Sequence, residues 1–227
     1  ALYEAIDINA IQRAVMRGKS VPTGTIVAQS INGWTPELAK RYPYNPEHAK
    51  QLLAEAGYPD GFSFTIDTPN NRWINDEAIT KAVAAMWSKI GLDVSVNAMP
   101  RAQFFPKMLS LNCSAYLVAW GINTFDALYG LQSLSQTFDP NTGKGLANLG
   151  RMSDARIDEL IAQAEVEADE QKRTKMLSDA LQIEKENYYH IPLHEQSLTW
   201  AMRKNVDARV TPNNRVDVLS ITVNPVK

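Results

Sequence analysis

The sequence has one cysteine, no long apolar segment and almost no net charge, and each shortage excludes a class of protein. Cys113 is the single cysteine among 227 residues, so the chain forms no internal disulfide and no multi-cysteine metal site. No wholly apolar run exceeds the six residues of 115–120, whereas a membrane-spanning helix needs about 20. Lys plus Arg number 23 and Asp plus Glu number 25. That balance lacks the strongly basic face typical of nucleic-acid binders, so we expect no nucleic-acid partner.

The N-terminal residues have the pattern of an amphipathic helix. Residues 2–17 carry Glu4, Asp7 and Arg13, which a secretory signal peptide with a charged start and an apolar middle would not. The chain begins inside this expected helix, with neither a Met nor a capping residue ahead of Ala1. We therefore expect a segment of a longer protein, and no targeting sequence indicates its compartment.

Helix and strand signals alternate along the chain. Gly18 is a helix stop, and a second helix has Asn45 as N-cap, Pro46 at its first position and Gly57 at its end. We expect further helices over 79–90 and 102–111, and after N-caps at Ser153 and Asp169. The expected strands cover residues 62–66, 92–96, 115–120, 191–200 and 216–223. This alternation predicts an α/β fold with a mixed sheet.

One strand and one loop stand out from this pattern. Residues 115–120 are apolar on both faces, which predicts a central strand in a sheet covered on both sides. Residues 121–152 contain Pro140 and several glycines and are expected to be irregular. A loop of that length in a compact domain is usually functional or disordered.

Residue patterns for catalysis or metal binding are weak. Gly18-Lys19-Ser20 lacks the upstream glycine and preceding strand of a phosphate-binding loop. His190 and His194, with Glu195 beside the latter, could seed a zinc site on a helix, but Pro192 lies between them and favours a strand. We predict a protein that is not an enzyme, with no metal and no cofactor. A hydrolase built on His194 and Glu195 is the alternative, although no nucleophile accompanies them.

The aromatic residues that follow the strand at 115–120 are the best candidates for binding. Ligands of α/β sheets favour loops beyond the carboxyl ends of strands, and an indole face beside a carboxylate can hold an apolar group together with a cation. In the alternative interpretation, Trp120 covers the core and Asp126 caps a helix that starts at Ala127. The candidates in this loop are Trp120, Asn123, Phe125, Asp126 and Tyr129.

Several segments resemble one known family. Residues 44–61, which read YNPEHAKQLLAEAGYPDG, resemble a hallmark of the family 5 extracellular solute-binding proteins, the peptide- and nickel-binding components of ABC importers. Other segments are similar to family elements in the same order: Ala5-Ile6-Asp7, 87–94, Trp120-Gly121 and 186–193. The resemblance covers essentially the whole chain and places it as the C-terminal half of such a protein.

The resemblance implies a mixed-sheet lobe of a type II (cluster C) periplasmic binding protein. Residues 1–227 would form one α/β ligand-binding lobe, with about 201–227 returning toward a second lobe encoded upstream. The implied function is capture of small peptides or similar solutes between two lobes and delivery to the permease subunits of an ABC transporter. The implied protein is monomeric and periplasmic, with its export signal upstream of Ala1. The alternative is a ligand-sensing domain of a cytoplasmic transcriptional regulator.

The family motif also implies particular ligand contacts. Peptide-binding members place an aspartate three residues after the motif tryptophan, where it pairs with the α-amino group of the peptide. That position is Asn123 here, which removes the charge assistance of the contact. We therefore expect Asp126 to serve as a displaced anionic anchor. Arg72 matches an arginine that binds the ligand carboxylate in dipeptide-binding relatives, and Arg101 is a weaker candidate.

Overall fold

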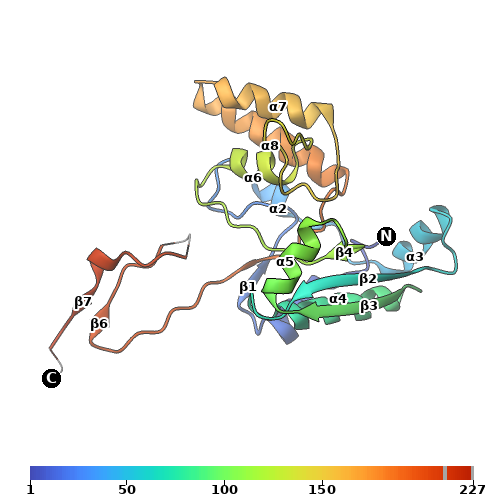
Figure 1. Cartoon of the computed structure of the whole chain (residues 1–227), viewed down its shortest axis with the longest axis horizontal. Coiled ribbons are helices and arrows are strands. Elements are labelled where there is room, and N and C mark those ends of the chain that lie inside the picture. Colours follow the sequence, from blue (N-terminus) through green and yellow to red (C-terminus); the bar gives the residue numbers. More distant parts are fainter. Residues whose placement is uncertain (212–213, 226–227) are drawn as a thin grey trace.

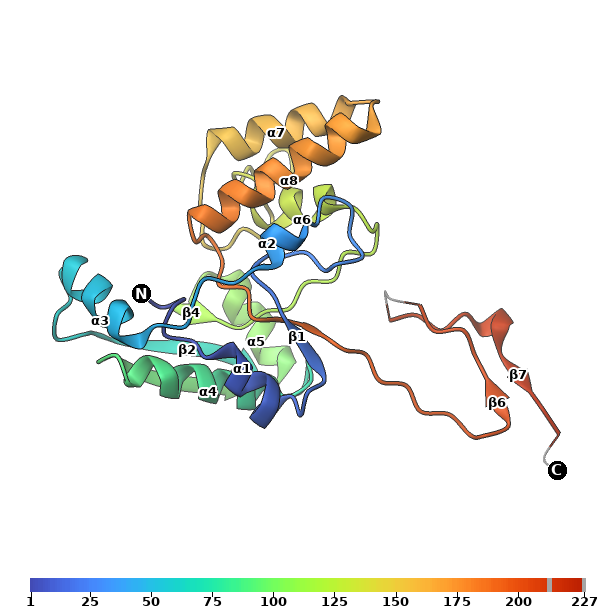
Figure 2. The same cartoon turned by 180° about the vertical axis from the view of Figure 1, so that it is seen from behind.

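Two large hydrophobic clusters organise the chain, and a third, small one contains Met99, Phe104 and Met108. The computed structural model describes residues 1–211 and 214–225. One cluster, the sheet core, lies around a parallel sheet, and the other, the helical core, lies among four helices (Figure 1). The described residues from about 201 onward form a C-terminal arm that extends away from both cores (Figure 2). No helix in the described ranges is long and apolar enough to cross a membrane.

The sheet core contains a three-stranded parallel sheet. Its strands are β2 (Ser63–Pro69), β3 (Asp93–Met99) and β4 (Ala115–Tyr116), in the order β3-β2-β4. Helix α4 (Asp76–Ser88) connects β2 to β3, and α5 (Arg101–Leu109) connects β3 to β4. The apolar side of the sheet, with Ile66, Val94 and Val96, packs in the same cluster as the inner face of α4. On the other side, Lys107 of α5 reaches Asp67 of β2, so the two helices cover opposite faces.

Just ahead of strand β2, the backbone at Gly61 passes very close to the backbone at Gly91. Gly61 has a φ of +73°, and a Cβ at this position would lie 1.9 Å from the carbonyl oxygen of Gly91. Only glycine fits such a position, because a side chain would collide with backbone. The approach ties the start of β2 to the turn between α4 and β3.

The helical core consists of short, individually capped helices. They are α2 (Pro36–Ala39), α6 (Ala127–Leu134), α7 (Ala155–Val166) and α8 (Glu170–Glu186). Their N-caps are Thr35, Asp126, Asp154 and Asp169, each of which accepts a hydrogen bond from a backbone amide of the first turn. Leu131, Ile157, Ile161 and Leu181 are fully buried between these helices. The predicted cap at Asp169 is confirmed, and the predicted cap at Ser153 lies one residue too early.

The N-terminal helix is shorter than the sequence pattern indicated. Residues 2–5 form turns, and Asp7 caps α1 (Ile8–Ala10), which continues as the π-helical segment η1 (Ile11–Val15). The predicted helix over 2–17 was wrong for its first six residues, because Asp7 accepts from the amide of Ala10 and fixes the start there. Helix α3 (Pro46–Glu55) starts at the predicted cap, where Asn45 accepts from the amide of His48.

Two antiparallel pairs complete the fold. Strand β1 (Ser20–Pro22) pairs with β5 (His194–Gln196), which brings residues from both ends of the chain together. In the C-terminal arm, β6 (Val206–Asp207) pairs with β7 (Thr222–Val223), and the 3-10 helix η2 (Val218–Ser220) precedes β7. The strands predicted at 191–200 and 216–223 are therefore reduced to short segments. Leu219 of the arm is 97% exposed, so the arm leaves apolar side chains uncovered.

The strand at 115–120 and the loop at 121–152 differ from expectation. Only Ala115–Tyr116 is a strand, and it lies at the edge of the described sheet, where β2 holds the central position. Apolar residues beyond it serve the two cores instead: Leu117 packs against the sheet core and Trp120 against the helical core. The loop contains helix α6, which starts immediately after Asp126. The α/β class itself is confirmed.

Candidate functional site

The topology of the sheet marks one edge for ligand binding. The chain leaves β2 toward β3 over one face and passes from β3 to β4 over the other, so the crossover direction changes between β2 and β4. In open α/β sheets, ligands bind outside the carboxyl ends of the strands at this switch point. The segments that leave these two ends are residues 70–75 and 117–129. They contain every residue predicted for the site from the sequence except the weaker candidate Arg101, which follows β3.

Trp120 and Tyr129 form the aromatic part of this edge. Their rings stack with centroids 6.0 Å apart and an interplanar angle of 30°. Tyr129 lies on α6 and is 38% exposed, whereas Trp120 is half-buried against the helical core. The indole Nε1 of Trp120 is buried and has no hydrogen-bond partner among the described residues. The pair offers an aromatic surface and one donor, as sites for partly apolar ligands do.

Asp126 has a structural role in this loop. Its Oδ1 accepts from the amide of Leu128 at 3.0 Å and caps α6, the role that the alternative interpretation assigned to it. Its two carboxylate oxygens also accept from Nη1 and Nη2 of Arg173, at 2.6 and 3.0 Å. Asn32 donates a further hydrogen bond at 3.1 Å. Burial raises the pKa of Asp126, but the hydrogen bonds from Arg173 and Asn32 outweigh it and hold the pKa below its usual value.

Asn123 and Phe125 lie on the exposed surface of the loop. Phe125 has a φ of +57°, in the left-handed region that bulky side chains rarely adopt, and its side chain is 38% exposed. Its carbonyl accepts from the amide of Asn32 at 2.9 Å, which holds the strained residue in place. The loop thus presents Phe125 and Asn123 to solvent from a backbone fixed on the helical core.

Arg72 lies on the other segment, after β2. Its amide and that of Trp73 both donate to Oδ2 of Asp76 at 3.0 Å, so the segment folds over the start of α4. The guanidinium of Arg72 is exposed and lies 5.3 Å from the ring of Trp73. No described hydrogen bond or ring contact joins Arg72 to the Trp120–Tyr129 loop. Arg101, also exposed, donates its amide to the side chain of Asn71.

His190 and His194 do not form a shared site. His190 Nδ1 lies 2.7 Å from Oε1 of Glu184, which is 1% exposed. His194 lies on β5, and burial lowers its pKa, as does the nearby charge of Arg41. Within the described ranges, no group of three or more His, Cys, Asp or Glu side chains could hold a metal ion.

Sequence reasoning missed Arg173 and Asn32, the two side chains that hold Asp126. Both lie far from Asp126 in the chain. Arg173 is also only one of several charged residues, of both signs, on α8. A lone basic residue on α8 gives no local signal that distinguishes it from Lys172 or Lys175. The one available signal was the helix cap at Asp126, which indicated that the carboxylate had a structural task.

The sequence has relatives among proteins of known role. The sequence profile of the bacterial extracellular solute-binding proteins, family 5 Middle, matches residues 1–142. The glutathione-binding protein GsiB of Shigella flexneri is 27% identical over 213 residues, which cover 91% of this chain and 40% of the relative. The heme-binding protein A of Haemophilus influenzae is 28% identical over 189 residues, 79% of this chain and 32% of the relative. The chain thus spans less than half the length of these relatives.

Solved structures show the same fold. The structure of HbpA2 from Haemophilus parasuis matches with a TM-score of 0.81 and 26% identity, over 99% of this chain and 44% of that chain. The oligopeptide-binding protein AppA of Bacillus subtilis, solved with a nonapeptide, matches with a TM-score of 0.83 and 21% identity, over 99% and 46%. The fold is therefore that of an α/β lobe of this class of binding protein.

Proposed function

Since this chain belongs to the bacterial extracellular solute-binding proteins of family 5, we propose that it is the ligand-capturing lobe of an ABC importer's substrate-binding component. The family consists of binding proteins, and the role requires no covalent chemistry. The observation that carries the proposal is the Trp120–Tyr129 stack at the switch point of the sheet. Affinity would come from enclosing a ligand between this surface and a second lobe.

The proposed ligand is a small peptide or a peptide-like solute. Its support is the glutathione-binding relative, since glutathione is a modified tripeptide, and the peptide-bound structure with the same fold. The proposed contacts are Arg72 for a ligand carboxylate and Trp120, Asn123, Phe125 and Tyr129 for the rest of the ligand. A ligand amine that used Asp126 would share its carboxylate with Arg173.

The remaining parts of the chain fit a two-lobed protein. We propose that residues 1–227 form one lobe and that the arm from about 201 returns to the other lobe. The exposed apolar side chains Val218, Leu219 and Val223 would be covered by that contact. The complete protein is proposed to work as a monomer in the periplasm and to deliver its ligand to permease subunits.

Native mass spectrometry of the complete protein, purified from its own cells without denaturation, tests the proposal. A bound mass that fragments as a peptide is the expected result. Tyr129→Ala should then lose the ligand, whereas Tyr58→Ala, which removes an exposed tyrosine ahead of the amino end of β2, should retain it. A bound mass of another chemical class would refute the peptide assignment, and equal retention by both variants would refute the assigned surface.

A further inference from the structure

Arg41 is a half-buried cation that has no carboxylate within ion-pair distance in the described ranges. Its Nη1 donates to the carbonyl of Thr23 at 2.9 Å and to the carbonyl of Pro192, and its Cζ lies 4.4 Å from the ring centre of Tyr3. These partners are neutral. Burial lowers the pKa of Arg41, which reflects the cost of holding the charge away from water. Such a charge is strongly stabilised by a negative partner.

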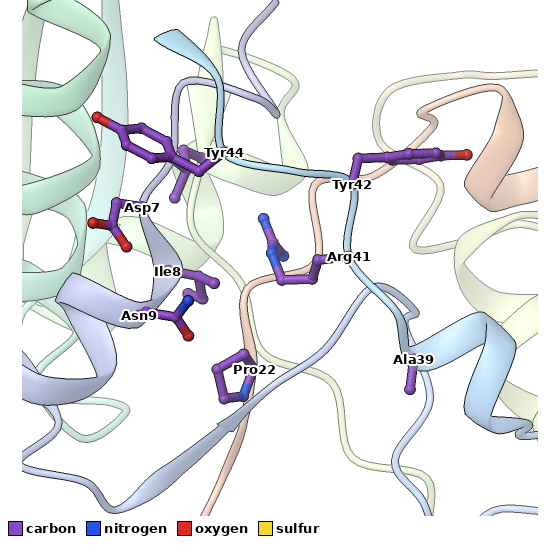
Figure 3. Close-up of a pocket in the computed structure, with 9 residues that line it drawn as sticks. Asp7, Ile8, Asn9, Pro22, Ala39, Arg41, Tyr42 and Tyr44 are labelled. Atoms are coloured by element: carbon purple, nitrogen blue, oxygen red, sulfur yellow. The ribbon is translucent and has the colours of Figure 1, made fainter.

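A cavity opens beside this guanidinium. It lies between the start of α1, strand β1 and residues 40–45, which connect α2 to α3 and include Arg41. Its volume is about 270 Å³, several times the share of liquid volume that one water molecule occupies. Figure 3 shows Arg41 reaching into the middle of the cavity, with the amide of Asn9 directed into the same space. Nη2 of Arg41 is buried and has no described hydrogen-bond partner, so a donor is available there.

We propose that this cavity binds a small, singly charged carboxylate through Arg41 and the amide of Asn9. A guanidinium suits this task because it stays charged and forms strong, charge-assisted hydrogen bonds to carboxylate oxygens. Nη1 is held by the two backbone carbonyls, which fixes the orientation of the fork and leaves Nη2 to the ligand. The site is separate from the Trp120–Tyr129 edge and shares no residue with it.

Asp7 sets the charge that the cavity accepts. Its carboxylate accepts from the amide of Ala10 at 2.9 Å and points away from Arg41 in Figure 3. It still lies on the cavity wall. A second negative charge on the ligand would be repelled by Asp7 without gaining another cation, so a monoanion is preferred over a phosphate dianion.

Calorimetric titration of the 227-residue chain with acetate and with inorganic phosphate, at constant ionic strength set with chloride, tests the site. Acetate should bind at one site and raise the thermal unfolding midpoint, since a ligand that binds only the folded state stabilises it. Phosphate should bind at least several-fold more weakly. Tighter binding of phosphate would overturn the carboxylate assignment.

Three variants make the test specific. Arg41→Gln should abolish acetate binding, but it also removes bonds to Thr23 and Pro192 and can unfold the chain. Asn9→Phe fills the cavity from an exposed position and leaves Arg41 intact, so it should abolish binding in a folded protein. Arg13→Gln removes an exposed arginine of η1 and should bind as the parent does. Unchanged acetate binding by Asn9→Phe, or no saturable binding by the parent, would overturn the proposal.

Discussion

Arg173 on α8 donates to both carboxylate oxygens of Asp126, the N-cap of α6, and so ties the two helices together beside the aromatic edge. Both side chains are 23% exposed. A bidentate pair with this degree of burial is stronger than a surface ion pair, and each partner depends on the other for charge compensation.

Replacing Arg173 tests that dependence. Arg173→Met should lower the free energy of unfolding by about 2 kcal/mol, because Asp126 loses the cation paired with it among the described residues while it remains partly buried. Lys175→Met, on the same helix, removes an exposed pair with Asp179 and should cost less than about 0.5 kcal/mol. Urea denaturation of both variants gives the comparison. Equal losses would show that the Arg173 pair adds nothing beyond a surface contact.

A second ion pair crosses from α5 to the centre of the sheet. Lys107 Nζ lies 2.5 Å from Oδ1 of Asp67, whose side chain is 1% exposed. Lys107→Met would leave a buried carboxylate without its cation, although the side-chain amide of Asn97 would still donate to it. We expect a loss of about 2–3 kcal/mol in unfolding free energy, below the full cost of a buried pair because Lys107 is itself partly exposed.

The matched control for Lys107 is Lys81, which forms an exposed pair with Glu77 on α4. Lys81→Met should change the unfolding free energy by less than about 0.5 kcal/mol. The double variant Lys107→Met with Asp67→Leu should recover part of the loss, since no uncompensated charge remains. Failure of the double variant to recover any stability would argue that the loss comes from packing around α5.

Local signals and distant contacts differ in how well the sequence predicts them. The caps at Asn45 and Asp169 were predictable because the capping side chain and the amide it accepts from are three residues apart. The edge position of β4 and the Asp126–Arg173 pair were not predictable from local sequence, because each depends on contacts between segments that lie tens of residues apart in the chain. The expectation of an irregular loop over 121–152 overlooked helix α6 because of the glycines around it, whereas the alternative interpretation of Asp126 as a helix cap was confirmed.

The candidate site divides in the same way. The position of the candidate residues in the fold was predictable, because Trp120 and Arg72 follow apolar strands whose carboxyl ends lie at one edge of the sheet. The ion pair between Asp126 and Arg173 was not predictable, because the sequence does not show which Asp pairs with which Arg. The sequence therefore predicts which edge of the sheet carries the candidate residues, but it cannot predict which of their polar groups are already paired.

Acid should destabilise the chain through Asp154. Hydrogen bonds from Arg156 lower the pKa of this carboxyl from 3.8 to about 2, with a further contribution from Tyr189. Because the folded pKa lies below the unfolded one, ionised Asp154 stabilises the fold fully above about pH 4. That contribution is lost as the pH falls from about 4 to 2.

The variant Asp154→Asn isolates this effect, because asparagine can still cap α7. Its unfolding free energy should be lower than that of the parent near neutral pH and should fall less steeply between about pH 4 and 2. Arg156→Gln should flatten the acid dependence as well, since it removes the main cause of the lowered pKa. Parallel pH curves for the parent and both variants would contradict the assignment to Asp154.

Asn123 offers a test of ligand chemistry in the two-lobed protein proposed above. The family resemblance implies an aspartate at this position for peptides with a free amino group, and Asn123 is exposed on its loop, so Asn123→Asp should not disturb the fold. A carboxylate there would form a charge-assisted hydrogen bond with the α-amino group and should tighten binding of such a peptide about tenfold, or roughly 1.4 kcal/mol. The same peptide with an acetylated amino group should gain nothing. An equal change for both peptides would mean that position 123 does not meet the ligand's amino end, and the ligand orientation implied by the family would then be wrong for this protein.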